Sequence, residues 1–245
     1  MKMSKKKSVG WLSTGNGEGS LGLLKKGIEL VNENKIEIKY IFTNRESGEK
    51  KGSDRFIDFA KSNNIKVISY SSQKYKKIKN SDWKNLRKSY DQEVLKKINP
   101  FKVDFIVAAG YMLFSPIICQ HYKILNIHPA LPNGPKGTWK TVIKELIKKE
   151  SKFSGVSLHL MTPDLDEGPN LSFCKFSIND NNLHEYWEDA KKCPNSIEET
   201  KLFKKIREII VKNERNLLLE TLDKISSNEI DIDKPNQYDL SDSFL

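Results

Sequence analysis

The chain has 245 residues, of which 37% are hydrophobic, and a mean hydropathy of −0.59. This length allows one large α/β domain or two small ones, and no apolar run approaches the roughly 18 residues of a membrane-spanning helix. The net charge of +10 attracts anions such as phosphates, polyglutamated cofactors or nucleic acid. Because most of this charge is lysine spread along the chain, we interpret it as a solvated surface and do not expect nucleic acid to bind.

The N-terminal residues indicate the cellular compartment, and the spacing of the cysteines indicates whether a metal or a disulfide is expected. The basic N-terminus continues into a strand-like segment without the apolar core of a secretory signal, so we expect a cytoplasmic protein with no membrane partner. Cys119, Cys174 and Cys193 lack the paired spacing of a zinc site or of a disulfide framework. We therefore expect no metal, and the oligomeric state stays open.

Hydrophobic periodicity predicts alternating strands and helices in the first half of the chain. Strands are predicted at 7–13, 36–43, 65–70, 104–109 and 124–127, and helices at 21–31, 53–63 and 83–98. Ser20 is the expected N-cap of the first helix, Ser115 with Pro116 the expected start of another, and 71–81 a polar surface segment. This order predicts a parallel sheet with right-handed crossovers.

The second half is predicted to continue with fewer strands and to end in a polar tail. A helix is predicted at 138–149, strands at 156–162 and 171–178, and a helix or helix pair at 200–225. Residues 226–245 hold five acids and one lysine, so we expect them to be loosely ordered. Because no repeat or linker is visible, we predict a single domain over residues 1–225 followed by this acidic tail.

The strongest chemical signal is the segment Asn126-Ile-His-Pro129. Side chains alternate along a strand, so Asn126 and His128 share one face while Leu125 and Ile127 face the other way. Pro129 ends the strand directly after the histidine. An amide donor and an imidazole therefore lie side by side at the carboxyl end of a strand, where open α/β sheets form their sites.

A second polar segment, Leu158–Pro169, begins as a strand and ends as a tight loop. His159 lies in the strand, and Asp164, Asp166 and Gly168 lie in the loop. We expect His159 to support the site, or equally to be a satisfied core histidine. The sequence alone does not predict whether this loop folds back to contact His128.

Taken together, these segments resemble the formyltransferase family. The resemblance is carried by four segments that span most of the chain: Thr14-Gly-Asn-Gly17, Ala109-Gly-Tyr-Met112, Asn126-Ile-His-Pro129 and Val156–Pro169. It implies a Rossmann-like formyltransferase fold, an α/β fold with a mostly parallel central sheet and helices on both faces. It also implies 10-formyltetrahydrofolate as the formyl donor.

The chemistry of formyl transfer gives these residues roles. An amine attacks the formyl carbon, and Asn126 and a protonated His128 can donate hydrogen bonds to the oxyanion that forms. Asp166 matches the family's catalytic aspartate, where it would favour the charged form of His128 and relay a proton from the amine.

The resemblance also implies two binding surfaces. The glycine loop, with the helix N-terminus behind it, can hold the phosphate of a small phosphorylated amine, provided that Glu18 points away. The residues predicted to bind this substrate are Gly15, Asn16, Gly17, Gly19, Ser20 and, by a loose match, Glu214. The residues predicted to bind the folate are Tyr111, Met112, Leu113, Phe114, Thr162 and Asp164.

The acceptor amine is the open question. Our first hypothesis is the amine of glycinamide ribonucleotide, in purine biosynthesis. Departures from the family pattern, such as Glu18-Gly19 in the phosphate loop, put this acceptor in doubt and leave open a nucleotide-linked amino sugar. Methionyl-tRNA and water are further alternatives, but we expect neither the RNA-binding domain that counts for the first nor the regulatory domain that counts for the second. An alternative from another class is a basic nucleic-acid-binding module on an inactive scaffold, for which Tyr75 and Trp83 among lysines give thin support.

Overall fold

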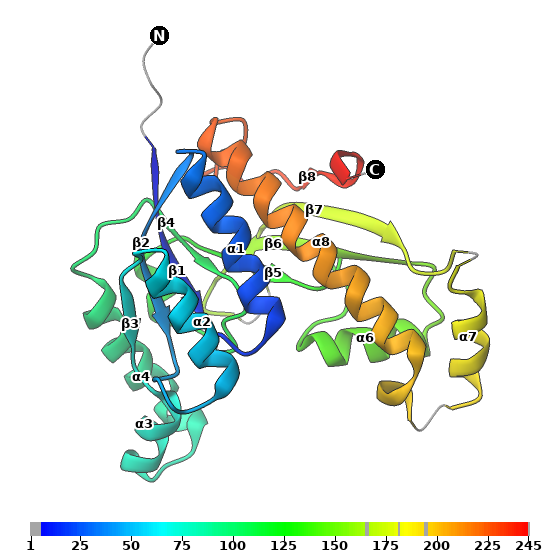
Figure 1. The fold of residues 1–245 in the computed structure, drawn as a ribbon, viewed down its shortest axis with the longest axis horizontal. Coiled ribbons are helices and arrows are strands. Elements are labelled where there is room, and N and C mark those ends of the chain that lie inside the picture. The colour runs from blue at the N-terminus through cyan, green and yellow to red at the C-terminus, as the bar shows by residue number, and fades with distance from the viewer. Residues whose placement is uncertain (1–5, 165–166, 181, 194–195, 245) are drawn as a thin grey trace. The chain divides into compact units, whose positions relative to one another are not determined.

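The computed structural model describes residues 6–164, 167–180, 182–193 and 196–244, which form two compact units (Figure 1). The first unit comprises Met1–Asn126, Leu160–Gly168 and Thr221–Asp231. The second comprises Ile127–His159, Pro169–Glu220 and Ile232–Leu245. We predicted a single domain over residues 1–225. The division into two units does not test this prediction.

The first unit is built on five parallel strands in the order β3-β2-β1-β4-β5. The strands are β1 (Lys7–Ser13), β2 (Ile36–Thr43), β3 (Val67–Ser69), β4 (Phe105–Ala108) and β5 (Ile124–His128). The helices between them are α1 (Glu18–Asn32), α2 (Lys51–Ser62), α3 (Ser72–Lys79), α4 (Trp83–Ile98) and α5 (Ile118–His121). The strand order reverses direction at β1, as in doubly wound α/β folds.

Helices cover both faces of these strands, because neighbouring side chains of β1 point in opposite directions. Trp11 is fully buried against α1, where Gly27 leaves room for its ring. Leu12 points to the other face and belongs to a buried cluster with Tyr90 and Val94 of α4. Two-sided packing explains why the middle residues of these strands are buried on both faces, as in Phe105–Ala108 of β4. It confirms the predicted parallel α/β architecture.

The second unit combines antiparallel and parallel pairing. Its elements are α6 (Trp139–Lys148), β6 (Phe153–Leu160), β7 (Asn170–Ser177), α7 (His184–Lys191), a 3₁₀ turn η1 (Ile197–Glu199), most of α8 (Lys201–Ser226), β8 (Tyr238–Asp239) and a 3₁₀ turn η2 (Ser241–Phe244). β6 and β7 are antiparallel, and β8 pairs with β7 in parallel. Among the strand pairs whose direction the structure describes, five are parallel and the pair of β6 with β7 is antiparallel, so the sheet is mostly parallel, as expected.

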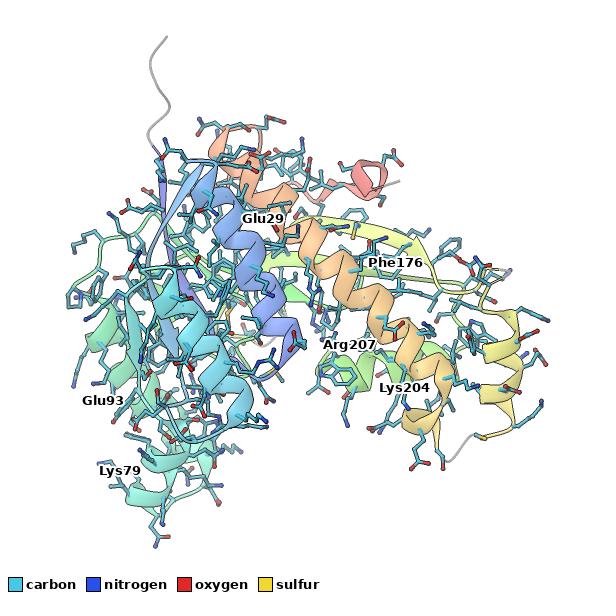
Figure 2. The ribbon with its side chains drawn as sticks, viewed as in Figure 1. Glu29, Lys79, Glu93, Phe176, Lys204 and Arg207 are labelled. Atoms are coloured by element: carbon cyan, nitrogen blue, oxygen red, sulfur yellow. The ribbon has the colours of Figure 1, made fainter. Side chains whose placement is uncertain are left out.

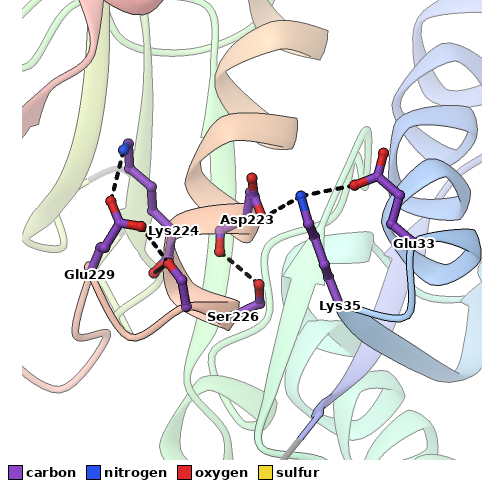
Figure 3. A network of polar contacts seen from close by, with 7 residues as sticks. Glu33, Lys35, Asp223, Lys224, Ser226 and Glu229 are labelled. Atoms are coloured by element: carbon purple, nitrogen blue, oxygen red, sulfur yellow. Dashed lines mark hydrogen bonds and ion pairs between the residues drawn. The ribbon is translucent and has the colours of Figure 1, made fainter. Parts of the chain in front are cut away.

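The end of α8 belongs to the first unit and is attached there by ion pairs (Figure 3). Lys35 Nζ lies 2.8 Å from carboxylate oxygens of both Glu33 and Asp223. Hydrogen bonds to Asp223 and Glu33 raise the pKa of Lys35. Farther along, Lys224 contacts Glu229 at 3.0 Å. Because these side chains are largely exposed to solvent, each pair contributes little to the free energy of unfolding.

The acidic tail differs from its expected loose order. Composition predicts that an acidic segment cannot bury enough apolar surface, yet Ile230 and Leu240 are buried. The Leu240 amide donates to the Phe173 carbonyl, and Lys175 donates its amide to the Ser241 hydroxyl. Leu240 and the two-residue strand β8 therefore hold part of the tail against β7.

Three local predictions are corrected. α1 begins at Glu18 with Gly17 as its N-cap, so Ser20 lies inside the helix. The expected surface segment at 71–81 contains α3, whose N-cap is Ser71 with its hydroxyl accepting from the Lys74 amide. The helix expected to start at Ser115 begins instead at Ile118.

Candidate active site

Asn126 and His128 both lie on β5, two residues apart, at the carboxyl end of a parallel strand. Leu125 is fully buried, Asn126 is half-buried, and His128 is 8% exposed. The apolar side of the strand therefore fixes it in the sheet of the first unit. The alternation of a strand then presents the amide and the imidazole on the same face, as the motif predicts.

The ring of His128 is held in one orientation by the loop that follows β5. His128 Nε2 lies 2.9 Å from the carbonyl oxygen of Pro135. A carbonyl oxygen only accepts hydrogen bonds, so Nε2 carries a hydrogen and Nδ1 is the nitrogen left for a substrate. The His159 ring packs beside it, with the ring centroids 6.1 Å apart. In the second unit, then, the structure brings together the two histidines of the motifs.

In the first unit, the glycine loop connects β1 to the N-terminus of α1. Gly15 and Gly17 have φ of 66° and 100°, conformations that favour glycine. A Cβ added to Gly17 would meet no atom within 4 Å, but the amides of Gly15 and Gly17 already donate to the Ser13 hydroxyl and the Gly15 carbonyl. Glu18, which had to point away from a bound anion, pairs with Arg55 at 2.8 Å. What the loop leaves for an anion is therefore the N-terminal turn of α1.

The segment predicted to bind the folate lies against this loop. The Thr14 amide donates to the Gly110 carbonyl at 3.0 Å, and the Met112 amide donates to the Thr14 hydroxyl at 2.9 Å. Gly110 has φ of 71° and faces Ser20, leaving no room for a side chain. Tyr111 is buried, whereas Met112 is 55% exposed. The first unit thus brings together the predicted phosphate loop and the start of the predicted folate segment.

Sequence reasoning missed two residues of α4 that hold this segment in place. Asp91 is fully buried and accepts from the amides of Ile117 and Ile118 at 2.7 and 3.0 Å. Arg87 Nη2 donates to the other oxygen of Asp91 at 2.9 Å. Burial raises the pKa of Asp91, while Arg87 opposes that rise. The sequence does place an Arg and an Asp four residues apart on a predicted helix, where they can form an ion pair. Such a pair is usually exposed, so this spacing did not predict a buried one.

The loop after β6 contains the remaining predicted residues. The Thr162 hydroxyl donates to the Asp164 carbonyl at 3.0 Å. Asp166 lies outside the described residues, so its predicted role stays a prediction. Gly168 packs so closely against the Leu160 carbonyl that no side chain fits there. The glycine of the Leu-Asp-x-Gly-Pro motif is therefore required by the closeness of the two ends of the loop.

Gly168→Ala is expected to destabilise the protein by about 1–3 kcal/mol, because the added methyl group would overlap the Leu160 carbonyl. Gly48→Ala is the matched control: its φ is 87°, but a Cβ there would meet no atom within 4 Å. Urea unfolding of both variants separates steric overlap from backbone strain. A smaller loss for Gly168→Ala than for Gly48→Ala would contradict the assigned close packing.

Glu214, the predicted ribose contact, is buried in the second unit. Both of its oxygens lie 3.5 Å from Arg207 Nη1, and the Arg207 guanidinium stacks 4.6 Å from the centre of the Trp139 ring. Burial raises the pKa of Glu214. The structure thus gives this carboxylate a partner on its own helix, and substrate binding by Glu214 stays a prediction.

The described residues contain neither a cluster of metal ligands nor a membrane-spanning helix. Among residues 6–164, 167–180, 182–193 and 196–244, no group of three or more His, Cys, Asp or Glu side chains is arranged to hold a metal ion. In the same residues, no helix is long and apolar enough to cross a bilayer.

Comparisons with known proteins agree with this geometry. Residues 24–194 match the family described as formyl transferase. Phosphoribosylglycinamide formyltransferase of Escherichia coli K12 is 35% identical over 95 residues, which cover 38% of this chain and 44% of that protein. Methionyl-tRNA formyltransferase of Wolbachia (strain wRi, from Drosophila simulans) is 28% identical over 178 residues, or 70% of this chain and 54% of that protein. The matches thus span about half the length of these relatives.

A solved structure supports the fold. Glycinamide ribonucleotide transformylase 1 from Symbiobacterium toebii superposes with a TM-score of 0.67 at 18% identity, covering 92% of this chain and 90% of that one. The parallel sheet, with polar side chains at the carboxyl end of β5, places the protein among α/β proteins with a site at the strand ends. The family match is more specific: the chain belongs to the formyl transferase family.

Proposed function

We propose that the protein transfers a formyl group from 10-formyltetrahydrofolate to the amine of glycinamide ribonucleotide. The observation that carries this proposal is the pairing of Asn126 with His128 on β5, where the His128 ring is oriented by the Pro135 carbonyl. The N-terminus of α1, directly after the glycine loop, supports a phosphorylated acceptor. The Escherichia coli relative, by its name, is a formyltransferase of phosphoribosylglycinamide.

The proposed reaction proceeds through a tetrahedral intermediate. The lone pair of the neutral amine forms a bond to the formyl carbon, and the carbonyl electrons move to oxygen. The Asn126 amide donates to this oxyanion, and a protonated His128 donates from Nδ1, since Nε2 is directed at Pro135. The attacking nitrogen gives up one proton, which the predicted base Asp166 accepts and passes on to the folate nitrogen. Collapse of the intermediate re-forms the carbonyl and breaks the bond to that protonated nitrogen, which leaves as the N–H of tetrahydrofolate.

The acceptor is tested by direct assay. Purified protein mixed with glycinamide ribonucleotide and 10-formyltetrahydrofolate is expected to release tetrahydrofolate, with His128→Ala as the inactive control. The same assay with methionyl-tRNA, a nucleotide-linked amino sugar or water as acceptor covers the alternatives. Turnover with one of these acceptors and none with glycinamide ribonucleotide would replace the proposed acceptor.

Asp166→Asn is expected to keep the fold and to lower kcat by about 10²–10⁴-fold, because the asparagine cannot accept a proton. Asp58→Asn, an exposed aspartate of α2 outside the predicted site, is the matched control for charge and is expected to keep most of kcat. Steady-state kinetics and circular dichroism of both variants give the comparison. Near-normal kcat in Asp166→Asn rules out the proton-relay role.

A further inference from the structure

The loop that orients His128 ends at the first residue of α6. The Pro135 carbonyl, which contacts His128 Nε2 at 2.9 Å, is separated from Trp139 by residues 136–138 alone. These residues are irregular, and Gly137 has φ of 98°, so the stretch does not hold Pro135 in place by its own hydrogen bonding. The position of this carbonyl therefore depends on where the first turn of α6 is held.

The first turn of α6 has one side chain that is suited to anchor it. The N-cap Thr138 and the residues Lys140 and Thr141 are exposed, and the buried face of the helix begins at Val142. The Thr138 hydroxyl accepts from the Thr141 amide, which closes the turn without attaching it to another element. Because helix ends fray more readily than helix interiors, the half-buried ring of Trp139 is the anchor of this turn.

The Trp139 ring packs against α8, in the same compact unit. Its centroid lies 5.8 Å from that of the Phe203 ring and 4.6 Å from the Arg207 guanidinium. Phe203 and Arg207 are four residues apart, so they lie on one face of α8. Arg207 projects from this helix toward α6 (Figure 2). The indole ring is thus held by an apolar contact and by the attraction between a cation and an aromatic face.

Arg207 is fixed in turn by a buried carboxylate. Both oxygens of Glu214 lie 3.5 Å from Arg207 Nη1, and Glu214 is only 6% exposed. The two residues are seven apart, which is about two turns along one face of the helix. Buried ion pairs often contribute more to a defined geometry than to net stability. Glu214 therefore sets where the guanidinium lies against the Trp139 ring.

A second contact between these segments is exposed and provides a control. Glu198 of η1, just before α8, lies 2.6 Å from Lys140 and also pairs with Lys144 of α6. All three side chains are partly open to solvent, which screens such pairs. Glu198 thus reaches the same helix as Arg207 does, but without touching the Trp139 ring.

We propose that Trp139 and Arg207 are positioning residues for His128. The guanidinium fixes the indole ring and with it the first turn of α6, and this turn fixes the carbonyl of Pro135. The carbonyl holds the Nε2–H of the imidazole, so that Nδ1 meets the substrate in one orientation. The kinetic part of this inference rests on the proposed function, whereas the orientation of the ring can be measured without it.

The test follows the Nε2–H of His128 by proton–nitrogen NMR spectroscopy of protein with isotope-labelled histidine. The chain has four histidines, and His128→Ala identifies the signal by removing it. A hydrogen-bonded N–H is protected from exchange with water, so we expect a sharp signal in the wild type. Trp139→Leu and Arg207→Lys should lose the signal through exchange. Trp139→Phe, which keeps an aromatic ring for Arg207, should retain it.

The choice of variants keeps the fold intact. Arg207→Lys preserves a positive charge beside the buried Glu214 but lacks the planar guanidinium that lies against the ring. Trp139→Leu leaves the pair of Arg207 and Glu214 in place. Urea unfolding identifies the variants that are folded, and if one of these two is unfolded, the other decides the test.

Steady-state kinetics distinguish positioning from a general loss of packing. In Trp139→Leu and Arg207→Lys, kcat is expected to fall by about 10–10²-fold, while KM for both substrates changes by less than about two-fold. A misplaced imidazole slows the chemical step without weakening the binding of substrate. Glu198→Gln should keep both kcat and the Nε2–H signal, because it removes only the exposed contacts to α6.

Each outcome decides between the alternatives. A wild type without the Nε2–H signal, a signal that persists in folded Trp139→Leu or Arg207→Lys, or a signal lost in Glu198→Gln overturns the positioning role. A higher KM for the acceptor in Arg207→Lys, with kcat and the signal unchanged, assigns Arg207 to substrate binding through Glu214 and also overturns it. Loss of the signal in both variants, in a protein that formylates no acceptor, upholds the positioning role and overturns the proposed function.

Discussion

Replacing His128 by alanine is expected to lower kcat for formyl transfer by about 10²–10³-fold. The ring is 8% exposed, and its Nε2–H is directed at the Pro135 carbonyl, 2.9 Å away, so its position is fixed before substrate arrives. A donor held in this way stabilises the developing oxyanion without reorganisation during the reaction, and the loss of one such donor typically has this magnitude.

Steady-state kinetics of His128→Ala, with His121→Ala as control, check this expectation. His121 is an exposed histidine at the end of α5, so its removal changes the histidine content but not the site. Asn126→Ala is expected to show a loss of similar size, because the two donors serve the same oxygen. If His128→Ala retained more than about a tenth of the wild-type kcat, oxyanion stabilisation by this ring would be excluded.

The second large effect is on stability. Asp91→Ala is expected to lower the free energy of unfolding by about 3–5 kcal/mol, because it leaves the Arg87 guanidinium buried without its counter-charge. The same change removes the acceptor of the Ile117 and Ile118 amides, at the start of α5. Burial raises the pKa of Asp91, and Arg87 and the two backbone amides oppose that rise.

Two further variants separate the charge from the hydrogen bonds. Asp91→Asn keeps an oxygen for the backbone amides but leaves Arg87 unpaired. Arg87→Met combined with Asp91→Asn removes both charges, and it is expected to recover much of the loss seen in Asp91→Asn alone. Urea unfolding of the three variants gives the comparison. A loss below about 1 kcal/mol for Asp91→Ala would show that the pair does not hold this segment.

Local pattern gave the regular elements and part of the site. The predicted boundaries of β1, β2 and α4 coincide with those in the structure, because strong hydrophobic periodicity begins and ends there. The pairing of Asn126 with His128 on one strand face was also predictable, since alternation is a property of the strand itself. Both inferences need only residues that are near one another in the sequence.

Predictions failed where the partner is distant in the sequence. Ser115 was expected to cap a helix, but the amides at the start of α5 donate to Asp91, 26 and 27 residues earlier in the chain. The segment 71–81 was expected to be a surface excursion, but Tyr75 buries its ring among aromatic residues of α4 and makes a helix favourable. In both cases, tertiary contacts determined the local structure more strongly than the local sequence did.

The sequence by itself determined the parallel α/β order of the elements, the amide–imidazole pair at the end of β5 and, through four separated motifs, the resemblance to formyltransferases. Tertiary structure alone decided the orientation of His128 and the buried pair of Arg87 and Asp91. The reason is physical: periodicity reports which face of an element is apolar, whereas hydrogen bonds and charge pairing depend on which elements fold against each other.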